Sequence, residues 1–294
     1  MNILSLSIII ATKNRSSLLA KNLSSLHGQC RGGDEVIVID ASDDDTPSVV
    51  TSFESSLPIR YVRFTKPGFP LFFNEGANVA QNPVLVFFSD DCTASPTFLE
   101  RIRNAQQRRT HAVIQGLTHS RPKGNLYADI MADHYKNWLT MMSLPHGELK
   151  SFDCKNVSMP RSLFWKHHGF RRRMSQGSED VEFGMRLRRS GIHIYLDRSI
   201  VAYHRERTNF GELLSQHRRF AESEGYLDRI LPKEERLGII PPQKLLLHLV
   251  SFLRREYLYL RRGSWQKAAL LPFVYAALAW IRVTGYATNR WGKP

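Results

Sequence analysis

The chain has 294 residues, of which 42% are hydrophobic and 23% are charged, and its formal net charge is +14 at pH 7. These proportions exclude a disordered or collagen-like chain, and the length allows one large domain or two smaller ones with a buried core. The excess of positive charge predicts an anionic partner: nucleic acid, an anionic membrane surface or a phosphorylated small molecule.

The three cysteines, Cys30, Cys92 and Cys154, lie far apart and form no CxxC pair. This spacing argues against a disulfide framework or a zinc cluster and favours a reducing compartment. The first seven residues contain neither a basic region nor a small-residue cleavage site, so we expect no signal peptide. We therefore expect a cytoplasmic protein, or one on the cytosolic face of a membrane.

Short apolar runs alternate with amphipathic stretches over the first 98 residues. We expect strands at 5–10, 35–39, 59–64 and 84–88, and helices at 16–26, from about 48, and at 74–81. Polar residues follow each apolar run, as at the ends of buried strands. This alternation predicts an α/β domain with a mostly parallel sheet and helices on both faces.

Two adjacent carboxylates, Asp90 and Asp91, follow the apolar run 84–88 directly. In open α/β sheets the ligand binds beyond the carboxyl ends of the strands. Neighbouring anions repel each other unless a cation binds them, and hard divalent cations prefer carboxylate oxygens. The pair therefore predicts either a metal site that holds a phosphorylated substrate or, alternatively, caps for a helix that starts near Ser95.

A second acidic pair, Glu179 and Asp180, follows glycine and serine at the start of an amphipathic helix. The positive end of the helix dipole stabilises ionised acids at this position. One interpretation is helix capping, with Ser178 as the cap. The other is a general base, because a carboxylate held beside a bound substrate can accept a proton from a hydroxyl group.

Several segments, in the right order over roughly the first 220 residues, resemble those of family 2 glycosyltransferases with the GT-A fold. The similar segments are 7–15, 36–46, 68–80, 89–91, 152–161, 175–188 and 200–204. The resemblance implies that the donor nucleotide contacts Ala11, Thr12, Arg15, Asp40, Asn74, Asp90 and Arg219. Asp40 corresponds to the family's nucleobase-binding aspartate, and Arg219 belongs to a segment that partly resembles the family's QxxRW motif. Phe220 replaces the tryptophan of that motif, which argues against processive synthesis.

The resemblance also implies the reactive part of the site. Asp91 and His204 correspond to ligands of a divalent cation, Mn²⁺ or Mg²⁺, and imidazole nitrogen suits Mn²⁺-like ions. Asp180 corresponds to the catalytic base, with Glu179 supporting it. Direct displacement by one base needs no covalent intermediate, so the resemblance implies transfer with inversion at the anomeric carbon.

From about residue 245 the composition changes. Apolar runs at 245–253, 257–260 and 268–281 are separated by the pairs Arg254–Arg255 and Arg261–Arg262. The last run is shorter than the roughly 20 residues that a spanning helix needs. The pattern favours amphipathic helices at an anionic membrane surface; the alternative is a helical pair packed on the catalytic domain or on a second subunit. We expect a catalytic domain at 1–220 (nucleotide half 1–98, acceptor half 99–220) and a helical tail at 221–294.

The leading prediction is an inverting glycosyltransferase of the hexosyltransferase type (EC 2.4), peripheral on the cytosolic face of a membrane. Its donor would be a nucleotide-diphosphate sugar, most commonly a UDP-sugar, and its acceptor a glycan or lipid-linked hydroxyl, as in polysaccharide biosynthesis. A sugar nucleotidyltransferase would need a glycine-rich loop after the first strand, and residues 11–15 do not form one. The charge alone allows a nucleic-acid- or membrane-binding protein with a degenerate site, but no nucleic-acid reader motif is present and we expect no nucleic-acid partner.

Overall fold

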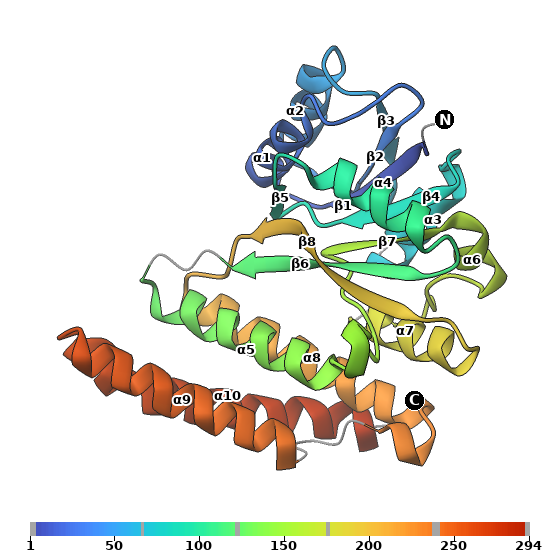
Figure 1. Ribbon diagram of the computed structural model, residues 1–294. Helices are drawn as coiled ribbons and strands as arrows, with labels where there is room; N and C mark the ends of the chain where they lie inside the picture. Colours follow the sequence, from blue (N-terminus) through green and yellow to red (C-terminus); the bar gives the residue numbers. More distant parts are fainter. Residues whose placement is uncertain (1–3, 66–67, 121–123, 175–176, 237–241, 292–294) are drawn as a thin grey trace. The chain divides into compact units, whose positions relative to one another are not determined.

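The structure is a computed structural model that describes residues 4–65, 68–120, 124–174, 177–236 and 242–291. The chain forms two compact units (Figure 1). The sheet unit comprises Met1–His119, Ser143–Ser175 and Glu179–Arg205, and the helical unit comprises Ser120–Met142, Gln176–Ser178 and Glu206–Pro294. This division differs from the boundary expected at residue 220, because the segments 120–142 and 206–220 group with the C-terminal helices.

An eight-stranded sheet runs through the sheet unit in the order β3-β2-β1-β4-β7-β6-β8-β5. The strands are β1 (Leu6–Thr12), β2 (Glu35–Asp40), β3 (Ile59–Arg63), β4 (Val84–Phe88), β5 (Cys92–Ala94), β6 (Val113–Ser120), β7 (Asn156–Pro160) and β8 (Ile194–His204). The first four strands in chain order are parallel to one another. β7 is antiparallel to β4 and β6, and β5 is antiparallel to β8. The expected parallel pairing thus holds for the N-terminal half, whereas the later strands make the sheet mixed.

Helices cover both faces of the sheet because the parallel strands are apolar on both sides. They are α1 (Ser16–Leu26), α2 (Thr46–Phe53), α3 (Phe69–Val79), α4 (Phe98–Arg108), α6 (Arg161–Lys166) and α7 (Glu179–Arg189), together with the short η1 (Pro145–Gly147). Ile8 and Ile10 pack in one core with residues of α1 and α4. Ile9, on the opposite face, touches α3 so closely that a Cβ at Gly76 would lie 2.3 Å from it.

The start of α3 differs from the expected one, and the start of α4 decides between the two interpretations of the pair Asp90–Asp91. α3 begins at Phe69 rather than Asn74, because Pro70 is accepted in a first helical turn, where its missing N–H is not needed. α4 begins at Phe98, and its N-cap residue is Thr97. The acidic pair Asp90–Asp91 lies upstream of β5 and does not cap this helix, so the capping alternative for that pair is wrong.

The helical unit consists of α5 (Leu126–Met142), α8 (Phe210–Ile230), η2 (Lys233–Glu235), α9 (Pro242–Arg261) and α10 (Trp265–Trp291). Its core contains apolar residues of all four long helices, among them Ile130, Leu213, Tyr259 and Leu271. Buried polar pairs join the helices: the Tyr259 hydroxyl donates to Asp129 at 2.7 Å, and that of Tyr286 donates to Asp228 at 2.6 Å. The predicted C-terminal helical tail is therefore present.

α10 is longer than the apolar run at 268–281 that we expected. The helix continues on both sides of that run, and Pro272 lies inside it. Within the described chain, Trp265–Asn289 has the length and apolar composition of a membrane-crossing helix. A helix in the core of a soluble protein can meet the same criterion, so composition alone does not assign a membrane span.

Candidate active site

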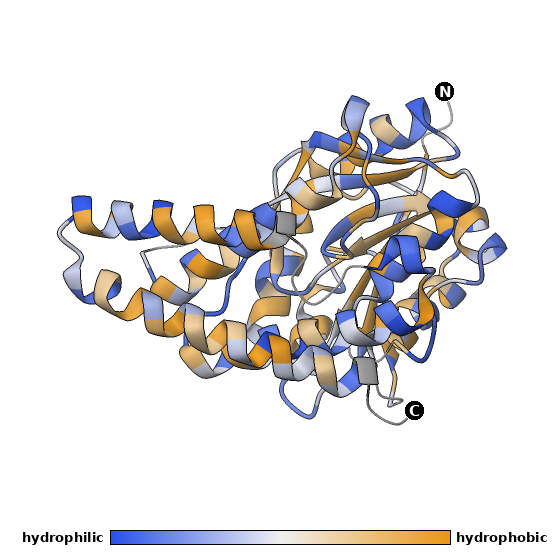
Figure 2. Cartoon of the chain, turned by 90° about the horizontal axis from the view of Figure 1, so that it is seen from below, coloured by the Kyte–Doolittle hydropathy of each residue, from blue (hydrophilic) through white to orange (hydrophobic). Residues whose placement is uncertain are grey.

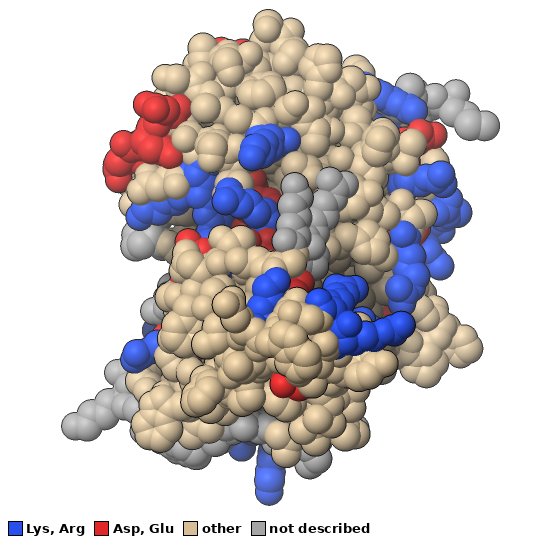
Figure 3. All heavy atoms as spheres, turned by 90° about the vertical axis from the view of Figure 1, so that its left-hand side faces the viewer, with Lys and Arg blue, Asp and Glu red and all other residues tan. Residues whose placement is uncertain are grey.

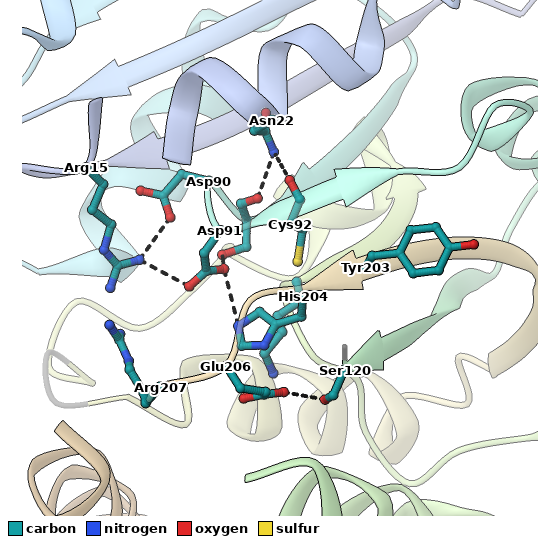
Figure 4. A network of polar contacts seen from close by, with 12 residues as sticks. Arg15, Asn22, Asp90, Asp91, Cys92, Ser120, Tyr203, His204, Glu206 and Arg207 are labelled. Carbon is teal, nitrogen blue, oxygen red and sulfur yellow. Dashed lines mark hydrogen bonds and ion pairs between the residues drawn. The ribbon is translucent and has the colours of Figure 1, made fainter. Parts of the chain in front are cut away.

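The sheet topology brings Asp91 and His204 together from distant parts of the chain. β5 begins directly after Asp91 and pairs antiparallel with the end of β8, so that Cys92 lies opposite His204. The backbone N–H of Arg205 donates to the Asp91 carbonyl at 3.0 Å. His204 Nε2 consequently lies 3.4 Å from Asp91 Oδ1 (Figure 4). The two residues predicted as metal ligands are thus adjacent.

The turn that carries the first acidic pair is held by α1. Asn22, which is fully buried, donates from Nδ2 to the carbonyl oxygens of Ser89 (2.8 Å) and Cys92 (3.0 Å) (Figure 4). The Ser89 hydroxyl donates to Asp91 Oδ1 at 2.7 Å. We did not predict a role for Asn22. The available signal was one buried polar residue among the leucines that form the apolar face of α1.

The loop after β1 contributes a cation to the same acidic pair. Arg15 Nη1 lies 2.9 Å from Asp90 Oδ1 and 3.3 Å from Asp91 Oδ2 (Figure 4). The Thr12 hydroxyl donates to Asp90 Oδ2 at 2.9 Å, and Ala11 precedes it as a buried residue of β1. Three predicted donor-site residues, Thr12, Arg15 and Asp90, therefore meet at the carboxyl ends of β1 and β4.

The two carboxyl groups of this pair differ in proton affinity. Burial, together with the negative charge of Asp91, raises the pKa of Asp90 to about 6. Burial alone would also raise the pKa of Asp91. The nearby His204 and Arg15 and the hydrogen bond from Ser89 outweigh burial, so the pKa of Asp91 lies well below its ordinary value. Asp91 is therefore ionised at neutral pH, as a cation ligand must be.

The second acidic pair begins α7. Asp180 Oδ1 accepts from the Val181 N–H at 2.8 Å, and Oδ2 accepts from the Cys154 N–H at 3.2 Å. Burial, together with the negative charge of Asp153, raises the pKa of Asp180 to about 6. Burial and the charge of Asp180 raise the pKa of Glu179 to about 8. At neutral pH, Glu179 is mainly protonated, whereas Asp180 can accept a proton.

The segment from Asp153 to Lys155 bonds to both acidic regions. The Cys154 N–H donates to Asp180, and the Lys155 carbonyl accepts from the Ser89 N–H at 3.2 Å. Lys155 Nζ lies 2.5 Å from Asp153 Oδ2, and its positive charge lowers the pKa of Asp180. We did not predict a role for Asp153 or Lys155. The signal in the sequence was an acid and a lysine, two residues apart, in a segment that resembles one of the family's segments.

Two further predicted residues have their polar atoms engaged within the protein. Asp40 is fully buried and accepts hydrogen bonds from the Tyr61 hydroxyl (2.6 Å), Arg63 Nη1 (2.5 Å) and the Ser42 N–H (2.8 Å). Asn74 Nδ2 donates to the Phe170 carbonyl at 2.8 Å, and its Oδ1 accepts from the Phe170 N–H at 3.0 Å.

These contacts give both side chains a structural role. Asp40 anchors the neighbouring strand β3, and Asn74 joins α3 to the turn at Phe170. The geometry adds no support to their predicted contacts with the donor. Arg219 belongs to the helical unit, where it lies exposed on α8.

Ser178, the cap in the alternative interpretation of the second pair, lies directly before α7. Its hydroxyl forms a hydrogen bond of 2.8 Å with the hydroxyl of Ser223. Both residues belong to the helical unit.

The acidic residues can be tested for their fit to a metal ion. Within the described ranges, no group of three or more His, Cys, Asp or Glu side chains is arranged to hold a metal. Asp91 and His204 nevertheless offer an ionised carboxylate and an imidazole, an oxygen and nitrogen donor set that suits Mn²⁺. The two residues therefore fit as protein ligands of a cation whose other ligands come from a phosphate-bearing substrate or from water.

The chain matches the sequence profile of glycosyl transferase family 2 over residues 7–168, which is more than half of its length. It is 29% identical over 225 residues to validoxylamine A glucosyltransferase from Streptomyces hygroscopicus subsp. limoneus, covering 66% of this chain and 50% of that protein. It is 26% identical over 238 residues to chondroitin synthase from Escherichia coli, covering 68% of this chain and 34% of that protein. The chain thus spans about half or less of the length of these relatives.

Solved structures are similar over nearly the whole chain. The mannosyltransferase PcManGT from Pyrobaculum calidifontis, in complex with GDP-Man and Mn²⁺, superposes with a TM-score of 0.63 at 18% identity, covering 98% of this chain and 88% of that one. Residues 1–349 of TarS from S. aureus, in complex with UDP-GlcNAc, superpose with a TM-score of 0.56 at 14% identity, covering 99% and 93%. These similarities establish the GT-A fold. With the family match, they show that the chain belongs to glycosyl transferase family 2, which confirms the prediction from the sequence.

Proposed function

We propose that this protein is an inverting glycosyltransferase that moves a sugar from a nucleotide-diphosphate sugar to an acceptor hydroxyl. The observation that carries the proposal is the meeting of Asp91, His204 and Arg15 at the ends of three strands, with Asp180 held by the segment that also bonds to Ser89. Family membership supports it. So do two solved structures of the same fold, which contain GDP-Man with Mn²⁺ and UDP-GlcNAc.

In this proposal, Asp91 and His204 hold a divalent cation, Mn²⁺ or Mg²⁺. When bound, such an ion offsets negative charge that develops on a leaving diphosphate. Arg15 adds a guanidinium group, which suits phosphate recognition, although it pairs with both aspartates in the described structure. A bound donor would therefore compete with Asp90 and Asp91 for this side chain.

Asp180 acts as the general base. Its carboxylate accepts the proton of the acceptor hydroxyl as that oxygen forms a bond to the anomeric carbon. The bond from the anomeric carbon to the diphosphate breaks in the same step, so the configuration inverts and the nucleoside diphosphate leaves. The raised pKa of Asp180, about 6, suits this role, because the group is mainly ionised at neutral pH yet holds a proton more tightly than an ordinary aspartate.

We also infer peripheral association with an anionic membrane surface on the cytosolic side. Apolar residues lie along the length of α9 and α10 (Figure 2). Four of them, Leu246, Val250, Phe273 and Trp280, are at least half exposed. Arg254, Arg261 and Arg262 are exposed next to them. On the face in Figure 3, Lys and Arg side chains (blue) cover more of the surface than Asp and Glu side chains (red). A lipid-linked or cell-surface glycan, as in polysaccharide biosynthesis, is the acceptor class that this location favours.

The first test is the thermal stability of the intact chain with GDP, UDP and other nucleoside diphosphates, each with and without Mn²⁺. A ligand of the folded state raises the melting temperature by mass action. We expect one nucleotide to give a metal-dependent rise that Asp91→Ala abolishes and Glu54→Gln retains, since Glu54 is an exposed acid on another part of the sheet unit. The absence of a shift with every nucleotide would contradict the proposal.

The two alternative functions have less support. The proteins with which the chain shares sequence or fold include glycosyltransferases of several specificities. A sugar nucleotidyltransferase or a nucleic-acid-binding protein is not favoured by these similarities. Binding of random-sequence DNA in preference to a nucleotide with Mn²⁺ would support the latter.

A further inference from the structure

The helical unit contains a cavity of about 370 Å³ between α5, α8, α9 and α10. Its volume lies in the range of ligand-binding pockets. The walls are largely apolar and include Ile130, Leu249, Phe252 and Leu278. The cavity lies wholly within the helical unit and contains none of the residues proposed for sugar transfer.

The side of the cavity formed by α9 opens onto an exposed apolar surface. Leu245 and Leu249 line the cavity although they are 57% and 50% exposed. Leu246, Val250 and Leu253 continue the exposed apolar surface along the same helix. Contiguous apolar surface of this kind marks an interaction site rather than ordinary solvated surface. An apolar chain could therefore pass from the cavity onto this surface without meeting a charged side chain of α9 between Leu245 and Leu253.

One part of the lining is charged: Arg282 lines the cavity from α10 and is only 7% exposed. One nitrogen of its guanidinium group, Nη2, pairs with Glu224. A second nitrogen, Nη1, is buried and has no hydrogen-bond partner among the described residues. A buried donor without a partner is costly, so this nitrogen calls for an acceptor that is not part of the described chain.

Three histidines and Tyr275 also contribute polar groups to the lining. The ring centroid of His134 lies 4.9 Å from that of His217 and 5.8 Å from that of His248. Imidazole groups can donate or accept hydrogen bonds and titrate near neutral pH. Among the described residues that line the cavity, there is no Asp or Glu. A cationic or titratable lining without acids favours an anionic ligand group over a cationic one.

We propose that this cavity binds a phosphate-bearing membrane lipid, with the phosphate at Arg282 and one apolar chain running out past Leu249 along α9. The combination of an unsatisfied guanidinium nitrogen, apolar walls and an apolar mouth matches an anionic amphiphile. It matches neither a free sugar nor a purely apolar molecule. Binding here needs neither the donor nucleotide nor Asp180, so the inference goes beyond sugar transfer and does not depend on it.

The first experiment titrates decyl phosphate, below its micelle-forming concentration, into the intact chain by calorimetry. Decanol and inorganic phosphate serve as comparison probes. We expect decyl phosphate to bind at least about tenfold more tightly than decanol, because one charge-assisted hydrogen bond in a buried site contributes at least that much. Inorganic phosphate should bind more weakly still. Equal affinity for decanol and decyl phosphate, or no binding of decyl phosphate, would overturn the proposal.

Two alanines of α10 provide matched variants. Ala279 lines the cavity and Ala276 does not, yet both are exposed on the same helix. Ala279→Phe should weaken decyl phosphate binding by about tenfold or more by filling the site, whereas Ala276→Phe should leave it unchanged. Equal effects of the two substitutions would place the ligand elsewhere and overturn the assignment. Nucleotide-induced stabilisation should persist in both variants, which separates failure here from failure of the transferase proposal.

The phosphate contact is tested by the double variant Arg282→Gln with Glu224→Gln, which removes the cation without leaving an unpaired acid. Its affinity for decyl phosphate should fall to the level of its affinity for decanol. The membrane as source is tested by sedimentation with phosphatidylcholine vesicles, with and without phosphatidic acid. Ala279→Phe should lose the extra binding that phosphatidic acid confers, while Ala276→Phe retains it. Equal binding to both vesicle types would exclude the membrane lipid as the ligand.

Discussion

The sheet unit contains two pairs of adjacent carboxylates, and their surroundings give them different properties. Asp90 and Asp91 face two basic side chains, Arg15 and His204. In the other pair, Asp180 accepts hydrogen bonds from backbone N–H groups, and burial raises the pKa of both Glu179 and Asp180. The surroundings of the first pair keep Asp91 charged, whereas the surroundings of the second pair raise the affinity of both acids for protons.

This contrast shows that the number of carboxylates does not determine what an acidic pair does. A cation beside a carboxylate favours its charged form, whereas burial without a cation favours its neutral form. The first environment suits binding of a metal ion and the second suits proton transfer. The following predictions test whether the two pairs really divide these roles, beginning with the largest effect.

Replacement of the proposed base, Asp180→Asn, should reduce turnover by about 10² to 10⁴-fold, because general-base catalysis contributes about that much and an asparagine side chain cannot accept the proton. The nucleotide- and Mn²⁺-dependent rise in melting temperature should persist, since Asp91 and His204 are unchanged. Turnover with a nucleotide sugar and the melting temperature measure these two effects. Glu54→Gln is the control for neutralising an acid. Near-normal turnover of Asp180→Asn in a folded protein would remove the distinction between the pairs.

The substitution Glu179→Gln should stabilise the protein above pH 8 by about 1 to 3 kcal/mol. Glu179 has a folded-state pKa of about 8, above its ordinary 4.5, so its contribution to stability is complete below pH 4.5 and is lost as the pH rises through 8. A neutral glutamine suffers no such loss. Urea unfolding of wild type and variant from pH 4.5 to 9 tests the prediction. A difference in unfolding free energy that does not vary with pH would show that Glu179 is not protonated in the folded protein.

Lys155→Met should move the pH dependence of kcat/KM to higher pH. Asp180 must be ionised to act as a base, so activity rises as the pH passes its pKa, which is about 6. Removing the positive charge of Lys155 raises that pKa, by about half to one unit. Asp153→Asn should shift the profile the opposite way, because Asp153 raises the pKa of Asp180. Lys155→Arg, which retains the charge, serves as the control. Coincident profiles for Lys155→Met and Lys155→Arg would contradict an electrostatic role for Lys155.

Much of the fold was predictable from local pattern. The apolar runs at 35–39 and 84–88 become β2 and β4, and the leucine spacing at 16–26 becomes α1, because buried strands and amphipathic helices have different periodicities. The order of the motifs also predicted the family. The family resemblance in turn implied that Asp91 and His204 lie together, as they do in the structure. These features depend on residues whose character is evident without their neighbours.

Other features depend on contacts between segments far apart in the chain. The family resemblance implied that Asn74 contacts the donor, whereas in the structure both polar atoms of its side chain are hydrogen-bonded to the backbone of Phe170. Asn22 holds a turn nearly 70 residues away, and the cavity beside Arg282 exists only where four helices meet. The two acidic pairs are almost alike in the sequence. Burial and the charges that face each pair make one suited to binding a cation and the other suited to accepting a proton, and both are properties of the folded chain.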